Sequence, residues 1–266
     1  MKTKHATIAQ SISGGMDSTC LLIHHLARDR DVHLLSFDYG QKHKLELERL
    51  DANLAYLESV GLGDRIHHTR LVVPFGQFAE SALTSDGQDV PRGFYEEENM
   101  KQTVVPNRNA IFSSMLFSLA LSVATRLGQE VSISLGVHSG DHAIYPDCRE
   151  DFFQQLHAAF QLGNWGGDQV RLSLPYIDGD KETILRGAVQ DCAKLGIDFD
   201  TVLRNTNTSY APTSEGKADG GTGSDVERIL AFHAIGRVDP VEYVEPWDVV
   251  LANALQSKAE FEKRIA

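Results

Sequence analysis

Apolar stretches with strand character alternate with stretches of helical periodicity along most of this chain of 266 residues. Strand character is found at 32–40, 66–73 and 130–138, and more weakly near the start of the chain at 5–10. Helical spacing of apolar residues is found at 44–61, 109–128, 149–163 and 181–196. This alternation is typical of parallel strands joined by crossover helices. We therefore expect an α/β fold built on a parallel sheet.

The composition is that of an ordinary globular chain with an acidic balance. Hydrophobic residues make up 42% and charged residues 23%, and the formal net charge is −12. A chain of this length can bury the core of one large domain or of a domain with an appendage. Non-specific binding to nucleic acid draws on clustered Lys and Arg, which this balance disfavours. We therefore expect no direct nucleic-acid binding.

The cysteines and the apolar runs bear on the cellular compartment. Cys20, Cys148 and Cys192 lie far apart and are odd in number, which favours neither a disulfide framework nor a Cys-x-x-Cys metal site. We see no apolar run of the roughly 18 residues that a membrane span needs. These features predict a cytoplasmic protein without a membrane contact.

Shifts in composition indicate how the chain is divided. The α/β pattern covers 1–204, and a Gly-, Asp- and Glu-rich excursion at 76–104 without periodicity predicts a lid. From 206 to 225 the chain is rich in Gly, Ser, Thr and Asp, which predicts a long loop before a last helical segment. We therefore expect a separate C-terminal extension over 205–266.

The segment SISGGMDSTC (11–20) places two adjacent glycines among hydroxyl side chains, directly after the first stretch with strand character. A strand, a Gly-rich turn and a helix in this order surround a phosphate with backbone N–H groups and a helix N-terminus. The loop lacks the Lys of a Walker A motif, which disfavours transfer of a γ-phosphate. The alternative is an ordinary strand-to-helix turn capped by Ser13 or Asp17.

The pattern Ser-Gly-Gly-x-Asp-Ser resembles the pyrophosphate loop of the N-type ATP pyrophosphatases, which split ATP between the α and β phosphates. Four later segments resemble successive motifs of the QueC family of 7-cyano-7-deazaguanine synthases: FDYGQKHKLELE (37–48), VPNRNAIFSS (105–114), YPDCREDF (145–152) and IDGDKET (177–183). The resemblance implies a PP-loop ATP pyrophosphatase core, which is Rossmann-like and similar to the adenine nucleotide alpha hydrolases. It also implies a 7-carboxy-7-deazaguanine substrate, whose carboxylate is adenylated by ATP and then attacked by an amine.

The resemblance assigns an ATP site and a set of catalytic groups. The ATP-binding residues would be Ser13, Gly14, Gly15, Asp17, Ser18, Tyr39 and Gln41, and Asp17 would also hold Mg²⁺ directly or through water. The cations expected near the phosphates or the substrate carboxylate are Lys42, His43, Arg108 and Lys181. Any one of these cations by itself would more often be a solvated surface charge. For Lys44 and Arg149, which lie near the motif edges, both a role in the site and a role as a surface charge stay open.

A guanine-like base offers neighbouring N–H donors to a carboxylate and a ring face to an aromatic side chain. Asp147 beside Tyr145 is the first candidate for this contact, and Asp141 is the second. Alternatively, Asp147 caps the helix expected to start at Arg149. The expected substrate-binding set is Arg108, Asn109, Asp141, Tyr145 and Asp147. We expect Cys148 to pack rather than react, because the implied chemistry needs no thiol.

The chain departs from the family pattern at a zinc site. The family has four zinc-binding cysteines near its C-terminus, and the matching positions here are Ser209, Asp219, Thr222 and Asp225, placed by their spacing from Tyr210 and Arg228. None is a thiolate, so we expect no zinc. The Gly-rich loop would then be held by hydrogen bonds or by a partner, or be flexible enough to admit a larger acceptor.

A second departure lies where the family has Cys-Glu-x-Asp and this chain has His138-Ser-Gly-Asp141. His138 is a candidate base for the attacking amine, because its ordinary pKa is close to neutral. The alternative is a buried histidine that donates a hydrogen bond to the backbone.

Three functions stay open at this point. The first is a ligase that joins the deazaguanine to an amine other than ammonia. In this function the chain would resemble the zinc-less QueC-like proteins of antiphage (CBASS) operons, and a protein such as a nucleotidyltransferase would be the acceptor. The second is an ordinary 7-cyano-7-deazaguanine synthase that uses ammonia. The third is a nucleotide-binding module without turnover. The resemblance also implies a homodimer.

Overall fold

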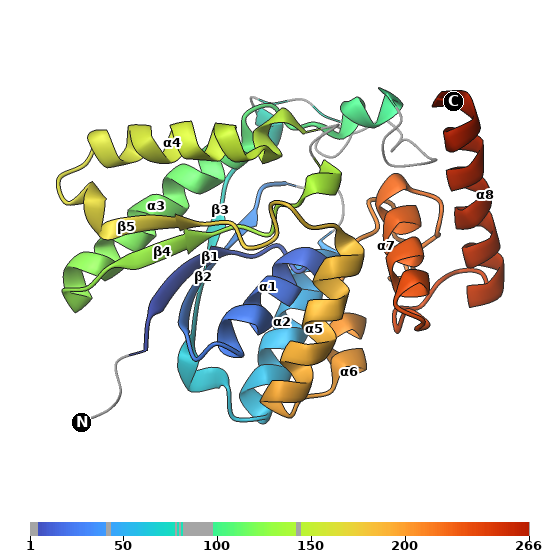
Figure 1. Ribbon diagram of the computed structural model, residues 1–266, viewed down its shortest axis with the longest axis horizontal. Coiled ribbons are helices and arrows are strands. Elements are labelled where there is room, and N and C mark those ends of the chain that lie inside the picture. The colour runs from blue at the N-terminus through green and yellow to red at the C-terminus, as the bar shows by residue number, and fades with distance from the viewer. Residues whose placement is uncertain are drawn as a thin grey trace.

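The computed structural model of this chain describes residues 5–40, 44–77, 79, 81, 98–141 and 145–265. Five strands form one parallel sheet in the order β3-β2-β1-β4-β5 (Figure 1). They are β1 (Thr7–Ser11), β2 (Asp31–Asp38), β3 (Ile66–Val72), β4 (Val131–Ser134) and β5 (Val170–Ser173). The strand order reverses between β1 and β4, and ligands of open α/β sheets bind at the carboxyl ends of the strands at such a point. The expected parallel α/β fold is confirmed.

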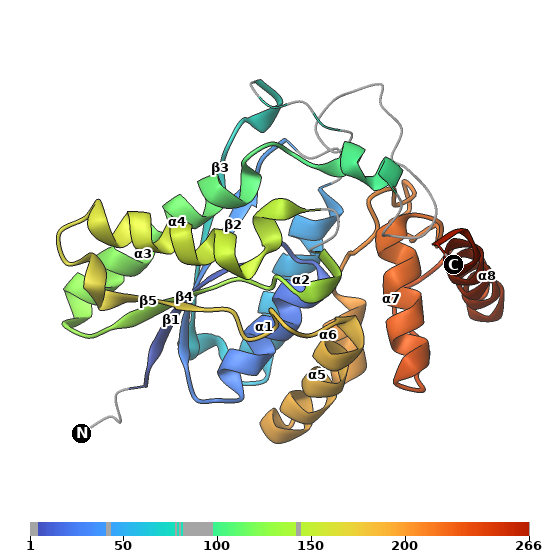
Figure 2. The same cartoon turned by 45° about the horizontal axis from the view of Figure 1, so that its top comes forward.

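Helices cover both faces of this sheet (Figures 1 and 2). One face carries α1 (Met16–Leu26), α2 (Leu45–Ser59), α5 (Lys181–Leu195) and α6 (Phe199–Arg204). The other face carries α3 (Arg108–Leu127) and α4 (Glu150–Leu162). Strand β2 shows how the sequence separates two cores: Leu34 is buried with α1 and α5, whereas Leu35 is buried with α3. Successive side chains of a strand point to opposite faces, so the adjacent apolar residues of β2 contribute to both cores.

Helix α3 is long and apolar enough by length and composition to cross a membrane. Our expectation that no apolar run has this length is therefore wrong by that measure. The helix packs one face on the sheet through residues such as Leu116 and Ala120, while Ser118 and Ser122 lie exposed and donate hydrogen bonds to carbonyls one turn earlier. The helix thus covers the sheet with one face and exposes the other.

The C-terminal residues form two further helices, of which α7 lies next to α5 and α8 lies beyond α7 (Figure 2). Helix α7 (Gly223–Ala234) packs on α5, and α8 (Trp247–Ile265) packs on α7. The stretch 205–222 holds no helix or ladder strand, as expected for a long loop. The expected helices and strands are confirmed, but β5 and α6 were missed. The boundary at residue 204 stays a prediction, and most of the expected lid at 76–104 lies outside the described residues.

Candidate active site

The Gly-rich loop between β1 and α1 has a backbone that requires glycine at one position. Gly14 has a φ of +93°, and a Cβ atom there would lie 2.0 Å from the backbone oxygen of Glu46. Any other residue would therefore push helix α2 away from the loop. The carbonyl of Gly14 accepts a hydrogen bond from the N–H of Asn207, 3.0 Å away. The loop is thus held between α2 and the segment that follows α6.

Hydroxyl groups order this loop from within. The Ser13 N–H donates to Oγ of Ser18 over 3.2 Å, and the Gly15 N–H donates to Oγ of Ser13 over 3.1 Å. Gly15 is the N-cap of α1, so the positive end of the helix dipole lies at this loop. Such an arrangement is suited to bind a phosphate group.

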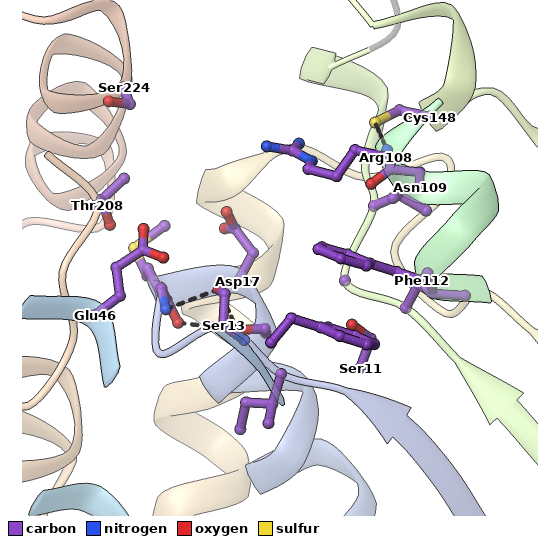
Figure 3. A pocket seen from close by; sticks show the side chains of 18 of the residues that line it. Ser11, Ser13, Asp17, Glu46, Arg108, Asn109, Phe112, Cys148, Thr208 and Ser224 are labelled. Atoms are coloured by element: carbon purple, nitrogen blue, oxygen red, sulfur yellow. Dashed lines mark hydrogen bonds between the residues drawn. The ribbon is translucent and has the colours of Figure 1, made fainter. Parts of the chain in front are cut away.

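A cavity of about 220 Å³ opens at this loop, at the carboxyl ends of β1, β2 and β4. Its base includes Ser13, Asp17 and Ser18, and Figure 3 shows Glu46 on one side of it and Arg108 with Phe112 on the other. The rings of Phe37 and Phe112, which both line the cavity, stack with centroids 3.8 Å apart. The cavity therefore offers phosphate-binding groups beside apolar ring faces that suit a planar base. Of the expected ATP-binding residues, Ser13, Gly15, Asp17, Ser18 and Tyr39 line it.

The start of α3 supplies a cation and an amide to the cavity. Arg108 and Asn109 both line it, and Tyr39 lies beside Arg108. Burial raises the pKa of Tyr39 to about 12, and the positive charge of Arg108 opposes this rise. Tyr39 is therefore a neutral hydroxyl near pH 7, and Arg108 is the cation that can meet an anionic ligand here.

The residues expected to bind the base differ in their placement. Tyr145 is buried and lines the cavity. Asp147 does not line it; its Oδ2 accepts a hydrogen bond from the Asn109 N–H at 3.4 Å, in the first turn of α3. It therefore stabilises the start of α3, not of α4 as the capping alternative had it, and it positions Asn109. The backbone of Asp141 lies in a short 3₁₀ turn, and its side chain lies outside the described residues.

Lys181 is the centre of a buried charged cluster at the cavity wall. Its Nζ atom lies 2.7 Å from Oε2 of Glu227, 3.4 Å from Oδ2 of Asp17 and 3.0 Å from Nε2 of His138. Only 5% of Lys181 is exposed. Two carboxylates offset the cost of burying its charge. Glu227 comes from α7, so the C-terminal extension contributes directly to the site.

His138 lies behind Lys181 and is fully buried. Its Nδ1 accepts a hydrogen bond from the Gly140 N–H over 3.1 Å, and the residue is not among those that line the cavity. The expected contact with an attacking amine therefore has no support in this geometry. The position matches the buried alternative, except that the ring accepts the backbone hydrogen bond. His138 is placed to orient Lys181.

The remaining residues expected near the phosphates lie either outside the described residues or on the surface. Gln41, Lys42 and His43 lie outside the described residues. Lys44 is exposed and pairs with Asp38 over 2.8 Å, as a surface charge does. Arg149 is exposed at the N-cap of α4 and is not among the residues that line the cavity. Cys148 is buried, lines the cavity and accepts a hydrogen bond from the Asn109 amide.

Sequence reasoning missed several residues that line the cavity. Glu46, Asn207, Thr208 and Ser224 line it and were not expected. Glu46 lies inside the segment 37–48, so the motif itself could have pointed to it. The other three come from the segment after α6 and from α7, where no local pattern indicates a contact with the loop.

Hydrogen bonds occupy the positions where the family has its zinc site. Oδ2 of Asp225 accepts from the hydroxyl of Ser209 at 3.0 Å and from that of Thr222 at 2.7 Å, and Thr222 caps α7 in return. Arg228 lies one turn further along α7, fully buried, and forms two hydrogen bonds with Asp239. Of the alternatives for this loop, hydrogen bonding is the one observed. The expectation of a larger acceptor stays a prediction.

We expect the purified protein to contain no stoichiometric zinc, because oxygen atoms stand where thiolates would be needed. The described residues include no group of three or more His, Cys, Asp or Glu that could hold a metal ion. Treatment with a chelator should leave the melting temperature unchanged. Elemental analysis that finds about one zinc per chain would contradict this expectation.

Asp225 should make stability depend on pH. Burial raises its pKa to about 7, the hydrogen bond from Thr222 opposes this rise, and the charge of Asp219 adds to it. Because this pKa lies above its ordinary value of 3.8, the folded chain holds the proton more tightly than the unfolded chain. The contribution is full below about pH 4 and is lost as the pH rises through about 7.

Melting curves between these pH values test the role of Asp225. Asp225→Asn keeps a neutral cap and should flatten the fall in melting temperature, whereas Asp248→Asn, on the exposed first turn of α8, should leave it unchanged. Equal pH dependence in the Asp225→Asn variant and the wild type would contradict the shifted pKa.

Comparisons with known proteins agree with this geometry. Residues 7–236 match a protein family described as "Queuosine biosynthesis protein QueC". A "7-cyano-7-deazaguanine synthase" of Caldicellulosiruptor saccharolyticus is 39% identical over 233 residues, which cover 87% of this chain and 93% of the relative. Another protein of that name, from Alteromonas mediterranea, is 42% identical over 231 residues, with 87% and 95% covered. A third, from Marinobacter nauticus, is 42% identical over 233 residues, with 87% and 94% covered.

Proposed function

The chain belongs to the QueC family, and from that premise we propose that it is an ATP-dependent ligase that adenylates the carboxylate of a 7-deazaguanine. Attack of an amine on the acyl adenylate would then give an amide and release AMP. The observation that carries this proposal is a single cavity that joins the Gly-rich loop to Arg108 and Lys181. A nucleotide bound at the loop and a carboxylate bound at Arg108 would share that space.

Each step has a group suited to it. A carboxylate is a poor electrophile, and adenylation turns one of its oxygens into part of a good leaving group. The N–H and hydroxyl groups of the loop would hold the pyrophosphate, and Lys181 would offset its negative charge. Arg108 would orient the substrate carboxylate toward the α-phosphate.

Mg²⁺ is the metal that the family resemblance implies. The Oδ1 atom of Asp17 is buried and has no hydrogen-bond partner among the residues that the structure describes, while Oδ2 lies near Lys181. A carboxylate oxygen left open at the base of the cavity fits a hard cation. Asp17 would hold the ion, which when bound would neutralise phosphate charge.

Ammonia is the amine that we propose, because the relatives are named 7-cyano-7-deazaguanine synthase and the nitrogen of a cyano group carries no further substituent. On this proposal the primary amide is dehydrated to the nitrile at the expense of a second ATP. The hydrogen-bonded state of the loop at 205–222 also supports a small acceptor rather than a large one.

The second candidate function is conjugation of the base to a partner protein in an antiphage system. A nucleotidyltransferase would then be the acceptor. The observation that favours it is the pair of departures from the family pattern, His138-Ser-Gly in place of Cys-Glu-x and the four positions without thiolates. We propose a homodimer for either candidate function.

The products decide between the two candidates. The protein is incubated with ATP, Mg²⁺ and 7-carboxy-7-deazaguanine, with and without ammonia, and the products are weighed by mass spectrometry. We expect AMP, pyrophosphate and the nitrile when ammonia is present. An amide that accumulates without becoming nitrile would favour conjugation, and no consumption of ATP in any mixture would contradict both.

A further inference from the structure

Glu46 presents a carboxylate to the cavity. It lies in the first turn of α2, where the contact of its backbone with Gly14 anchors it beside the Gly-rich loop. Its side chain lines the cavity, and it forms no hydrogen bond or ion pair with any residue in the described ranges. The mechanism above gives this carboxylate no role.

We propose that Glu46 binds the attacking amine and accepts its proton, an assignment that rests on the proposed function. The amine nitrogen forms a bond to the carbonyl carbon of the acyl adenylate, and the bond from that carbon to the AMP oxygen breaks. AMP leaves with the electron pair of that bond. The proton lost by the nitrogen passes to the Glu46 carboxylate, so that atoms and charge balance.

The geometry separates Glu46 from the groups that would hold the acid. In Figure 3 Glu46 lies across the cavity from Arg108, with Thr208 and Ser224 on its own side. A substrate carboxylate at Arg108 would therefore have its activated carbon between the two sides. The hydroxyls of Thr208 and Ser224 offer oxygen acceptors to the other N–H groups of a small amine.

The other titratable groups that line the cavity are already engaged. Asp17 lies 3.4 Å from Lys181, and the raised pKa of Tyr39 keeps it protonated near neutral pH. Tyr145 exchanges a hydrogen bond with Thr103, and Cys148 accepts one from Asn109. Among these groups Glu46 is the carboxylate that remains to meet a cationic or proton-donating ligand.

The titration of Glu46 suits this role. Burial raises its pKa to about 7, and the positive charge of Arg108 on α3 opposes the rise. The other charged or titratable groups that line the cavity are Asp17 on α1, Lys181 on α5, Tyr39, Tyr145, Cys148 and Tyr210. A base with a pKa near the working pH transfers protons efficiently. Amide formation should therefore increase as the pH rises through about 7, because the deprotonated form is the active one.

Two half-reactions test the proposal, with Glu48→Gln on the exposed side of the same helix turn as the matched control. Without amine, Glu46→Gln should release pyrophosphate from ATP and 7-carboxy-7-deazaguanine as the wild type does. With ammonia, its amide formation should fall about 10²-fold and lose the pH step near 7. Glu46→Asp, which keeps a carboxylate, should restore part of the rate and the pH step.

Two results would overturn the assignment: amide formation unchanged in Glu46→Gln, or pyrophosphate release reduced as much as amide formation. Should the Gln variant fail to fold, the pH profile of Glu46→Asp decides, and a profile identical to that of the wild type in rate and midpoint contradicts the proposal. A wild-type protein that releases no pyrophosphate with this acid would instead overturn the proposed function itself.

Discussion

Replacing Asp17 with Asn should lower pyrophosphate release by about 10²-fold or more while the protein stays folded. The substitution keeps the shape of the side chain but removes the charge from the oxygen that lies open at the base of the cavity. Without that charge, this side chain no longer balances the positive charge of a bound Mg²⁺ ion. Lys181 keeps its shorter contact with Glu227, so the charged cluster does not lose its cation.

Pyrophosphate release and thermal melting, measured on the same preparation, check this prediction. Asp29→Asn is the matched control, because Asp29 is exposed just past the end of α1 and adopts a positive φ that Asn also tolerates. Normal pyrophosphate release by the folded Asp17→Asn protein would remove Asp17 from the ATP site.

Replacing Arg228 with Met should lower the free energy of unfolding by about 3–5 kcal/mol. The Arg228 guanidinium forms two hydrogen bonds with Asp239, at 2.6 and 2.9 Å, and both side chains are buried. It also donates to the hydroxyls of Thr206 and Thr208, and Thr208 lines the cavity. The variant would leave a buried carboxylate without its cation and would release the segment that borders the site.

Denaturant unfolding measures this loss, with Arg204→Met at an exposed position as the control. The double variant Arg228→Met with Asp239→Asn should recover part of the loss, because no uncompensated charge stays buried. An Arg228→Met protein as stable as the control would show that the extension is held by other contacts.

Local patterns predicted those parts of the molecule that depend on neighbouring residues. The alternation of apolar segments predicted the parallel sheet, and Ser13, Gly15 and Ser18 lie at the cavity because strand, turn and helix follow one another directly. Strand β5 has only four residues, and its short apolar pattern gave no signal of its own. Strand β4 is equally short, but it was predicted because the stretch with strand character around it runs over 130–138.

The placements that no local pattern predicted depend on tertiary contacts. Glu227 reaches Lys181 because α7 packs on α5, and the two residues are 46 positions apart. His138 follows a buried strand, and from the sequence alone a position behind Lys181 could not be distinguished from a position in the cavity. Asp147 was expected to bind the base, with capping of the following helix as the alternative, but its Oδ2 accepts from the Asn109 N–H in the first turn of α3.

Transfer of labelled oxygen tests the central claim that the carboxylate is adenylated. The acid is prepared with oxygen-18 at both carboxylate oxygens and incubated with ATP, Mg²⁺ and ammonia, and the nucleotide product is weighed. Adenylation followed by amine attack breaks the bond between the carbonyl carbon and the bridging oxygen, so each AMP molecule formed in that step should carry one oxygen-18 atom. Unlabelled AMP, or ADP together with labelled phosphate, would contradict the account.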